Sequence, residues 1–240
     1  MKIKSFKLFL EKNNYSNNTI VTYINILSLY KNDFKNIVKI KNKILNRYKN
    51  ANTIHTHFNV ICSYMKWASD KRIDILKQIK LPKIPVVYMN VFTKKYLLKK
   101  TKLKKGDSET CKYKKNLVKF LFETGIRANE LFNIIEIKSK TLKILGKGNK
   151  VREIFHNYET TKSIKEFIYT TKTLRLWVKE ILGEKFTPHS IRRSMATHLL
   201  LNGASPKMVM TQLGHEKVET TYRYLNLSLE DNWKIYNEYF

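Results

Sequence analysis

The segment TPHSIRRSMATHLL, residues 187–200, places a histidine and two arginines in the first turns of an expected helix. Thr187 suits the N-cap and Pro188 the first helical position. His189 and Arg192 lie three residues apart, so they share a face at the helix end whose free N–H groups favour an anion. Cations there are unfavourable by about 0.3–1 kcal/mol each unless an anion is present. The segment predicts a phosphate site; the alternative is a set of solvated side chains without a role.

Two further segments carry side chains that suit phosphate chemistry. TGIRANEL places Arg127 just after a glycine turn, and Glu130 follows three residues later, where it can orient the guanidinium. TQLGHEKVETTYRYL places His215 after a glycine and Tyr224 nine residues beyond it. Tyr222 lies seven residues after the same histidine.

The first 80 or so residues are expected to form helices. Apolar residues recur at helical spacing in residues 16–30 and again in residues 52–69. Pro82 and Pro85 then fall in QIKLPKIPVVYMN, which should be extended and non-helical. We therefore expect an N-terminal helical bundle over residues 1–78 and a linker over residues 79–90.

The second unit is expected to span residues 91–240. Its segment NLVKFLFETGIRANELFNI suggests a helix, a glycine break and a further helix start. The segment IIEIKSKTLKILGKGNKVREIF alternates as three short strands would, with Gly146, Gly148 and Asn149 in the last turn. Helices return from about residue 160. The sequence thus predicts a mainly α protein of two domains, the second holding a small three-stranded antiparallel sheet.

The charge of the chain points to a polyanionic partner. There are 47 Lys and Arg residues against 19 Asp and Glu residues, which gives a net charge of +28. Such an excess favours nucleic acid first and an anionic membrane surface second. An AT-rich coding bias toward lysine is the alternative explanation, and it would inflate the charge without any function.

Targeting signals and metal-ligand patterns are not evident. The two cysteines, Cys62 and Cys111, match neither a disulfide framework nor a zinc spacing. No stretch resembles a signal peptide or approaches the roughly 20 apolar residues of a membrane span. We expect a cytoplasmic protein that uses no metal and no cofactor.

The motifs taken together resemble the tyrosine recombinases, or phage integrase family. That family carries an arginine in a TGxRxxEL segment, a lysine on a β-hairpin, HxxR, LGH and a tyrosine nine residues after the last histidine. This sequence reads TGIRANEL, GKGNK, HSIRR, LGH and TYRY in that order. Each motif alone is weak, but five in the family's order are specific. The resemblance covers essentially the whole chain, because the N-terminal helices look like the family's core-DNA-binding domain.

The resemblance implies a catalytic set of six residues: Arg127, Lys147, His189, Arg192, His215 and Tyr224. Tyr224 would attack the scissile phosphate and form a 3′-phosphotyrosyl link. Tyr222 is the competing candidate, and the family's spacing of nine residues favours Tyr224. The two arginines would hold the non-bridging oxygens, and the two histidines would add hydrogen bonds and assist proton transfer. Lys147 would protonate the leaving 5′-oxygen, although Lys150 lies close by. Glu130 would hold the arginines in position, or else be an ordinary surface carboxylate.

The resemblance also implies how DNA is bound. The N-terminal helices and the C-terminal domain would clamp double-stranded DNA from two sides, mainly through phosphate contacts. The basic residues expected to contribute are Lys66, Lys71, Arg72, Lys150, Arg152 and Arg193. Four subunits would act on two DNA sites, as a homotetramer or with a paralogue, and an accessory activator protein is possible. The apolar stripe in residues 229–240 would form a helix exchanged between subunits, the alternative being packing on its own domain.

Several functions compete within and beyond this family. The chain looks compact and similar to the Xer-type recombinases that resolve chromosome or plasmid dimers. A phage or transposon integrase is the alternative, and a type IB topoisomerase is a second enzymatic class with similar residues. A non-catalytic DNA-binding relative would gain nothing from an activated tyrosine. A metal-dependent nuclease would need a carboxylate cluster that the sequence does not display.

Overall fold

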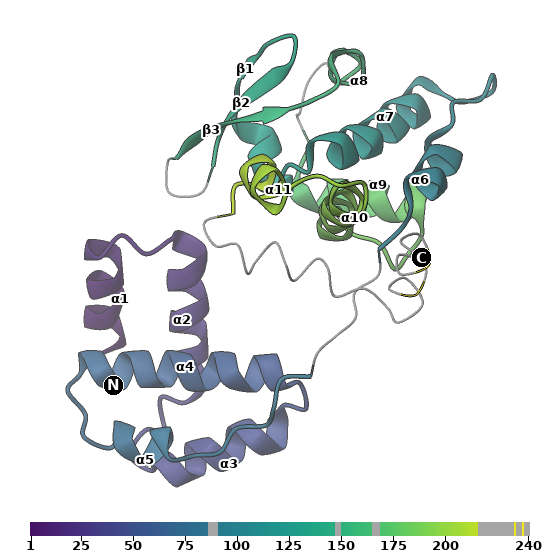
Figure 1. Ribbon diagram of the computed structural model, residues 1–240. Helices are drawn as coiled ribbons and strands as arrows, with labels where there is room; N and C mark the ends of the chain where they lie inside the picture. Colours follow the sequence, from purple (N-terminus) through teal and green to yellow (C-terminus); the bar gives the residue numbers. More distant parts are fainter. Residues whose placement is uncertain (86–90, 147–149, 165–168, 216–232, 234–236, 238–240) are drawn as a thin grey trace. The chain divides into compact units, whose positions relative to one another are not determined.

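The computed structural model describes residues 1–85, 91–146, 150–164, 169–215, 233 and 237 (Figure 1). The chain divides into two compact units, Met1–Val87 and Tyr88–Phe240. Most of the described residues lie in helices, and one three-stranded antiparallel sheet belongs to the second unit. The predicted fold class is thereby confirmed. Residues 80–85, which contain both linker prolines, have no regular secondary structure.

The first unit is built from five helices: α1 (Ile3–Lys12), α2 (Asn17–Leu29), α3 (Ile37–Arg47), α4 (Ala51–Trp67) and α5 (Ile73–Lys77). In Figure 1, α1 and α2 stand side by side across α4, and α3 and α5 lie along the other side of α4. Side-chain caps define the helix starts: Ser16 accepts a hydrogen bond from the N–H of Thr19, and Asn50 accepts one from Thr53. The long α4 therefore forms the centre of the unit.

The core of this unit follows the expected apolar stripes. On α4, Ile54, Phe58, Ile61 and Met65 are buried, whereas Ala68 is exposed because it is the C-cap of the helix. Trp67 is partly buried and packs against this core. Burial of such apolar surface is the main force that stabilises a unit of this size.

A buried polar pair, which the sequence patterns did not reveal, crosses the core between α2 and α4. The hydroxyl of Tyr30 lies 2.7 Å from Nδ1 of His57, and the ring of Tyr48 lies 4.4 Å from the imidazole. Burial, and then the charge of Arg47, lowers the pKa of His57. Burial and the neighbouring Tyr48 raise the pKa of Tyr30. The neutral imidazole therefore accepts the hydrogen bond that the Tyr30 hydroxyl donates.

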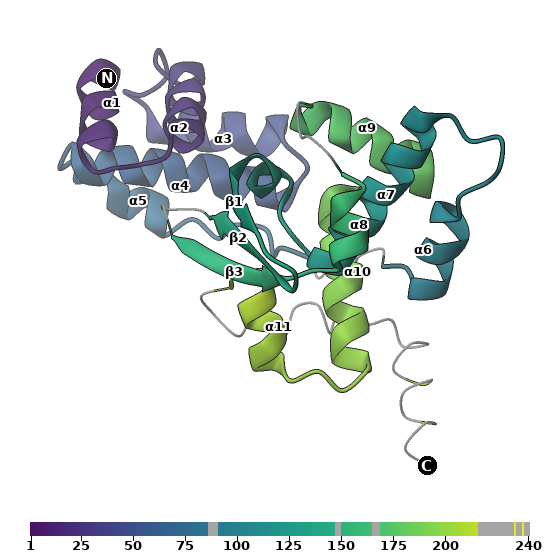
Figure 2. The ribbon, with the colours of Figure 1, turned by 90° about the horizontal axis from the view of Figure 1, so that it is seen from above.

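In the second unit, the helices pack against one side of the sheet (Figure 2). Its elements are α6 (Lys94–Thr101), α7 (Glu109–Thr124), the 3-10 helix η1 (Ala128–Asn133), β1 (Ile134–Ile137), β2 (Thr141–Leu145), β3 (Val151–Phe155), α8 (Tyr158–Lys162), α9 (Thr171–Leu182), α10 (Pro188–Leu201) and α11 (Pro206–Leu213). The strand order is β1-β2-β3, with Ile144 opposite Arg152. The three predicted strands are confirmed, and the helix expected after the glycine break is a short 3-10 helix.

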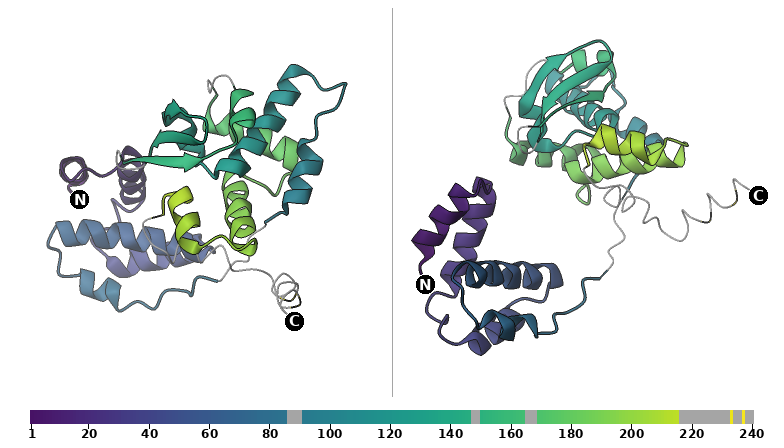
Figure 3. Two further views of the ribbon diagram at one scale, coloured as in Figure 1. Left: turned by 45° about the horizontal axis from the view of Figure 1, so that its top comes forward. Right: turned by 60° about the vertical axis from the view of Figure 1, so that its left-hand side comes forward.

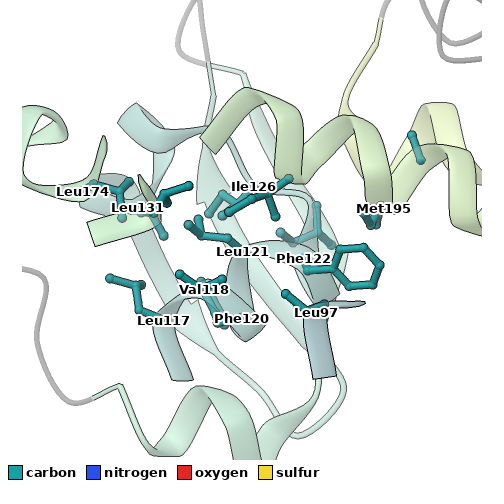
Figure 4. Packing of buried hydrophobic residues seen from close by; sticks show 14 of the residues in the cluster. Leu97, Leu117, Val118, Phe120, Leu121, Phe122, Ile126, Leu131, Leu174 and Met195 are labelled. Atoms are coloured by element: carbon teal, nitrogen blue, oxygen red, sulfur yellow. The ribbon is translucent and has the colours of Figure 1, made fainter. Parts of the chain in front are cut away.

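Helix α7 runs through the middle of this unit and carries much of its core. Val118 and Leu121 are at most 1% exposed, and they belong to the same buried cluster as Leu174 of α9 and Met195 of α10 (Figure 4). Two further views show α10 and α11 next to each other at the edge of the unit (Figure 3). The C-terminal ends of α7 and α11 therefore lie close to the N-terminal half of α10, where Arg192 contacts both.

The buried His57 predicts a pH-dependent stability of the first unit. Its pKa in the folded chain lies below the ordinary 6.5, so the unfolded chain binds more protons. The stabilisation is therefore complete above pH 6.5 and is lost as the pH falls below it. We expect the urea midpoint of this unit to fall between pH 7 and pH 5, read from Trp67 fluorescence in a Trp177→Phe, Trp233→Phe background.

The matched variant is His57→Gln in the same background. It has no ionisable group at this position, so its urea midpoint should change less over the same pH range. An equal change in both proteins would show that His57 does not cause the pH dependence.

Candidate active site

Two glycine turns bring three candidate residues together from distant parts of the chain. Gly125 ends α7 with φ +61°, and Gly214 ends α11 with φ +62°, both in the left-handed region that favours glycine. Arg127 follows the first turn and His215 follows the second. Arg192 lies in the second turn of α10 and points to the same place, as its contacts show.

The start of α10 has the cap that the sequence predicts. Thr187 is the N-cap, its hydroxyl accepts a hydrogen bond from the N–H of Ser190, and Pro188 occupies the first turn. The Ser190 hydroxyl in turn accepts a hydrogen bond from the N–H of Thr187. This reciprocal pair fixes the direction in which the helix enters, and with it the position of His189 and Arg192.

Arg192 is held by the carboxyl ends of two helices. Its side chain is buried, with 2% of the residue exposed. One terminal nitrogen donates to the carbonyl of Gly125 over 2.6 Å, and the other donates to the carbonyl of Leu213. These carbonyls lie at the negative ends of the α7 and α11 dipoles, which favour a cation. The buried guanidinium is therefore compensated before any ligand arrives.

His215 is a neutral imidazole in this arrangement. Burial, followed by the charges of Arg192, Arg127 and Arg152, lowers its pKa to about 4. Its Nε2 lies 3.1 Å from a terminal nitrogen of Arg192. Because a guanidinium only donates, Nε2 must accept, and the proton of the neutral ring must be on Nδ1. The ring is thus held in one tautomer.

Arg127 is positioned by a buried carboxylate. Glu130, with 5% of its side chain exposed, accepts hydrogen bonds from a terminal nitrogen of Arg127 (2.7 Å) and from the Arg127 N–H (2.9 Å). It also accepts two from Arg152, at 2.8 and 3.0 Å. Burial alone would raise the pKa of Glu130, but these hydrogen bonds outweigh it and lower the pKa. Arg127 keeps 40% of its side chain exposed, so it can still meet a ligand.

An open cleft of about 860 Å³ lies next to these residues. Arg127, His189 and Arg192 line it, together with Lys172 and Arg175 of α9. Partial burial, and then the charges of neighbouring arginines, lowers the pKa of His189. The cleft therefore combines permanently charged donors with a neutral histidine, a set that suits a phosphodiester and its proton transfers.

Gln212 is a structural partner of this site that sequence reasoning missed. It is 3% exposed and donates to the carbonyls of Thr124 and Phe155, both over 2.9 Å. Its own carbonyl accepts the N–H of Phe155 over 2.9 Å. It thereby joins the ends of α7, β3 and α11. A glutamine in an amphipathic helix gives no signal of burial, so only the structure reveals this role.

Several predicted residues lie apart from the cluster or outside the described residues. Lys147, Tyr222, Tyr224 and all of the predicted C-terminal helix except Trp233 and Asn237 are outside the described residues. Lys150, which is among the described residues, is exposed.

The remaining predicted DNA contacts fall into two groups. Lys66 and Lys71 are exposed on the first unit. Arg72 instead pairs with Asp70 and donates to two backbone carbonyls, and Arg193 is only 9% exposed. Contact of these residues with DNA remains a prediction.

Among the described residues, no cluster of histidine, cysteine and acidic side chains could hold a metal ion. In the same part of the chain, every helix is too short or too polar to pass through a bilayer.

Comparison with known proteins matches residues 169–230 to the phage integrase family. The tyrosine recombinase XerD of Staphylococcus saprophyticus is 30% identical over 158 residues, which are 52% of this chain and 54% of the relative. Tyrosine recombinase XerC of Staphylococcus epidermidis is 31% identical over 153 residues, 51% of this chain and 52% of the relative. The chain therefore spans about half the length of the curated relatives it matches.

Solved structures of low sequence identity share the fold. The XerH site-specific recombinase bound to its palindromic difH substrate has a TM-score of 0.68 at 20% identity, covering 95% of this chain and 83% of the other. The Tn1549 transposon integrase in complex with circular intermediate DNA has a TM-score of 0.68 at 16% identity, covering 99% of each chain. The match over residues 169–230 and the related sequences show that this chain is similar to tyrosine recombinases and to the phage integrase family, and the solved structures show a shared fold.

Proposed function

We propose that the protein is a site-specific recombinase that cuts and rejoins double-stranded DNA through a 3′-phosphotyrosyl intermediate. The observation that supports this best is the convergence of Arg127, His189 and Arg192 on one cleft, with His215 within 3.1 Å of the Arg192 guanidinium. Four groups from three separate segments of the chain are thereby gathered in one region. A chain that only bound DNA would not need two neutral histidines beside two buried or half-buried guanidiniums.

The proposed reaction assigns a separate role to each group. Arg127, whose guanidinium is partly exposed, and Arg192 bind the non-bridging oxygens of the scissile phosphate. Tyr224 attacks phosphorus as His189 accepts its proton, and the bond from phosphorus to the 5′-oxygen breaks. Lys147 gives a proton to that oxygen. The phosphotyrosyl link conserves the energy of the phosphodiester, so rejoining by the reverse steps needs no ATP, and the cations make a metal unnecessary.

The electrostatics of the site suit this chemistry at neutral pH. The pKa values of His189 and His215 both lie below the ordinary value, so both rings are neutral in the free protein. A neutral imidazole can accept a proton, whereas an imidazolium cannot. The arginines stay charged throughout. The permanent cations thus supply the charge stabilisation, and the histidines remain available for proton transfer and hydrogen bonding.

The basic surface supports double-stranded DNA as the substrate. The exposed Lys172 and Arg175 extend the cleft along α9, and the net charge of the chain is +28. These residues can neutralise phosphates that flank the reacting one. We also propose that Lys66 and Lys71 of the first unit contact the backbone of the same DNA, because both side chains are exposed.

The biological setting we propose is Xer-like resolution of DNA dimers in the cytoplasm. Its support is the similarity to XerD and XerC of staphylococci. Four copies, or two of this chain with two of a paralogue, would act on two sites, and an accessory protein would activate exchange. Integration of a mobile element and relaxation of supercoils are the competing outcomes. Exchange between two sites on separate DNA molecules would exclude a topoisomerase.

A covalent complex on a nicked DNA substrate tests the proposed function directly. Wild-type protein should form a protein–DNA band on a denaturing gel in the presence of EDTA and without ATP. Tyr224→Phe should form none, because it lacks the attacking oxygen, while Tyr222→Phe should behave as wild type. No band with any target DNA would contradict the proposal, and loss of the band only in Tyr222→Phe would move the nucleophile.

The lowered histidine pKa values predict the pH dependence of the same reaction. At DNA concentrations below the dissociation constant, the rate reflects ionisations of the free protein. Protonation removes the acceptor at His189 and the hydrogen bond from Arg192 to His215. Because both pKa values are lowered, the rate should stay level down to pH 6.5 and fall only below it. A midpoint at or above pH 6.5 would contradict the assignment.

The cations of α9 predict a change in the salt dependence of DNA binding. Lys172→Ala with Arg175→Ala should weaken binding at every DNA sequence alike. The slope of log K against log salt should become less steep by about 1.8, since each neutralised phosphate contributes about 0.9. Lys99→Ala with Lys100→Ala on α6 is the matched control for a loss of two charges. Equal slopes for the two double variants would show that α9 does not contact phosphates.

A further inference from the structure

Arg152 lies at the junction of the β2–β3 hairpin and the arginine cluster. It is the second residue of β3 and stands opposite Ile144 of β2. Both of its terminal nitrogens donate to Glu130, one to each carboxylate oxygen, over 2.8 and 3.0 Å. Only 17% of its side chain is exposed, so its bidentate pair is largely shielded from solvent.

The same guanidinium is packed against Gly214. A Cβ built on this glycine would collide with a terminal nitrogen of Arg152 and would lie 2.7 Å from the central carbon of its guanidinium. The space that a side chain would fill is therefore occupied by the guanidinium. The carbonyl of Gly214 accepts a hydrogen bond from Arg127 over 3.2 Å. One glycine is thus held between two arginines, directly before His215.

We propose that Arg152 is a positioning residue of the active site and not a contact to DNA. It acts on Arg127 through the shared carboxylate of Glu130. It acts on His215 through the packed backbone of Gly214. This inference rests on the proposed recombinase function, because it assigns a role within that reaction.

The position of Arg152 on the hairpin gives it a second link. The N–H of Gly146 donates to the carbonyl of Lys150 over 2.8 Å, and Lys147 lies between these two residues in the sequence. Arg152 follows Lys150 by two residues, and a terminal nitrogen of its guanidinium is 3.5 Å from where a Cβ of Gly146 would be. Arg152 therefore joins the β2–β3 hairpin to Glu130 and, through it, to Arg127.

The charge of Arg152 also contributes to the state of His215. After burial, the charges of Arg192 and Arg127 and then that of Arg152 lower the pKa of the imidazole. A positive charge in this place keeps the ring neutral, in agreement with the geometric role. A lysine would preserve the charge, but it cannot reproduce the planar two-point contact with Glu130. Arg152→Lys therefore separates geometry from charge.

The test compares DNA binding with chemistry in Arg152→Lys. Single-turnover formation of the covalent complex, measured with protein in excess over a nicked DNA, should slow about 10- to 100-fold because the reacting groups are misplaced. The dissociation constant for DNA should stay within twofold of wild type. Glu153→Gln is the matched control: it changes the neighbouring residue of β3, which makes an exposed ion pair with Lys138, and should react at the wild-type rate.

A double-mutant cycle with Glu130→Gln distinguishes positioning from general loss of structure. If Arg152 acts through Glu130, the double variant should be little slower than the slower single variant. If the losses of rate in the two single variants multiplied in the double variant, the inference would be overturned. A wild-type rate in Arg152→Lys would also overturn it, and so would a weakening of DNA binding that accounts for the whole loss of rate. Thermal unfolding of each variant shows whether it is folded. If Arg152→Lys is not folded, Arg152→Gln replaces it in the cycle.

A readout that needs no catalysis keeps this inference separate from the proposed function. Without DNA, the pKa of His215 measured by NMR should rise in Arg152→Met and stay near the wild-type value in Glu153→Gln. An unchanged pKa in Arg152→Met would overturn the coupling of Arg152 to His215. If wild-type protein formed no covalent complex but this shift were present, the recombinase proposal would fail and the coupling would stand.

Discussion

The compensation of the buried Arg192 guanidinium by the carboxyl ends of α7 and α11 is the interaction on which the second unit depends. A cation with 2% exposure would be strongly destabilising without partners, and the carbonyls of Gly125 and Leu213 supply them. Both helices must therefore end at this place. Because the residues that follow these ends are Arg127 and His215, the same constraint that stabilises the fold also assembles the site.

This arrangement changes the explanation for cations at the start of α10. The sequence alone suggests that a bound anion must offset the unfavourable charge at a positive helix end. In the structure, carbonyl groups offset the charge of Arg192 internally, while Arg127 keeps an exposed part of its guanidinium. The site thus has one cation fixed by the protein and one held by Glu130 at the cleft. Such preorganisation lowers the cost of ordering charged groups when a phosphate binds.

Local patterns were sufficient to predict the elements, but not the contacts between them. The cap at Thr187, the three strands and the helical stripe of α4 follow from side-chain chemistry and periodicity, and the structure agrees with them. The buried Tyr30–His57 pair and the joints made by Gln212 depend on residues far apart in sequence. A polar residue on a helix gives the same pattern whether it faces solvent or a buried carbonyl, so these contacts had no local signal. The shared use of Glu130 by two arginines is of the same kind, since only one of the two is near it in sequence.

We propose that these cations hold one DNA phosphate for attack by a tyrosine. The most direct measurement is mass spectrometry of the covalent complex after digestion with protease and nuclease, which identifies the residue and the linkage. The account predicts a nucleotide joined through its 3′-phosphate to the phenolic oxygen of Tyr224, with a free 5′-hydroxyl on the released strand. A link to a residue outside this segment, or cleavage that leaves a 5′-phosphate and no adduct, would contradict it.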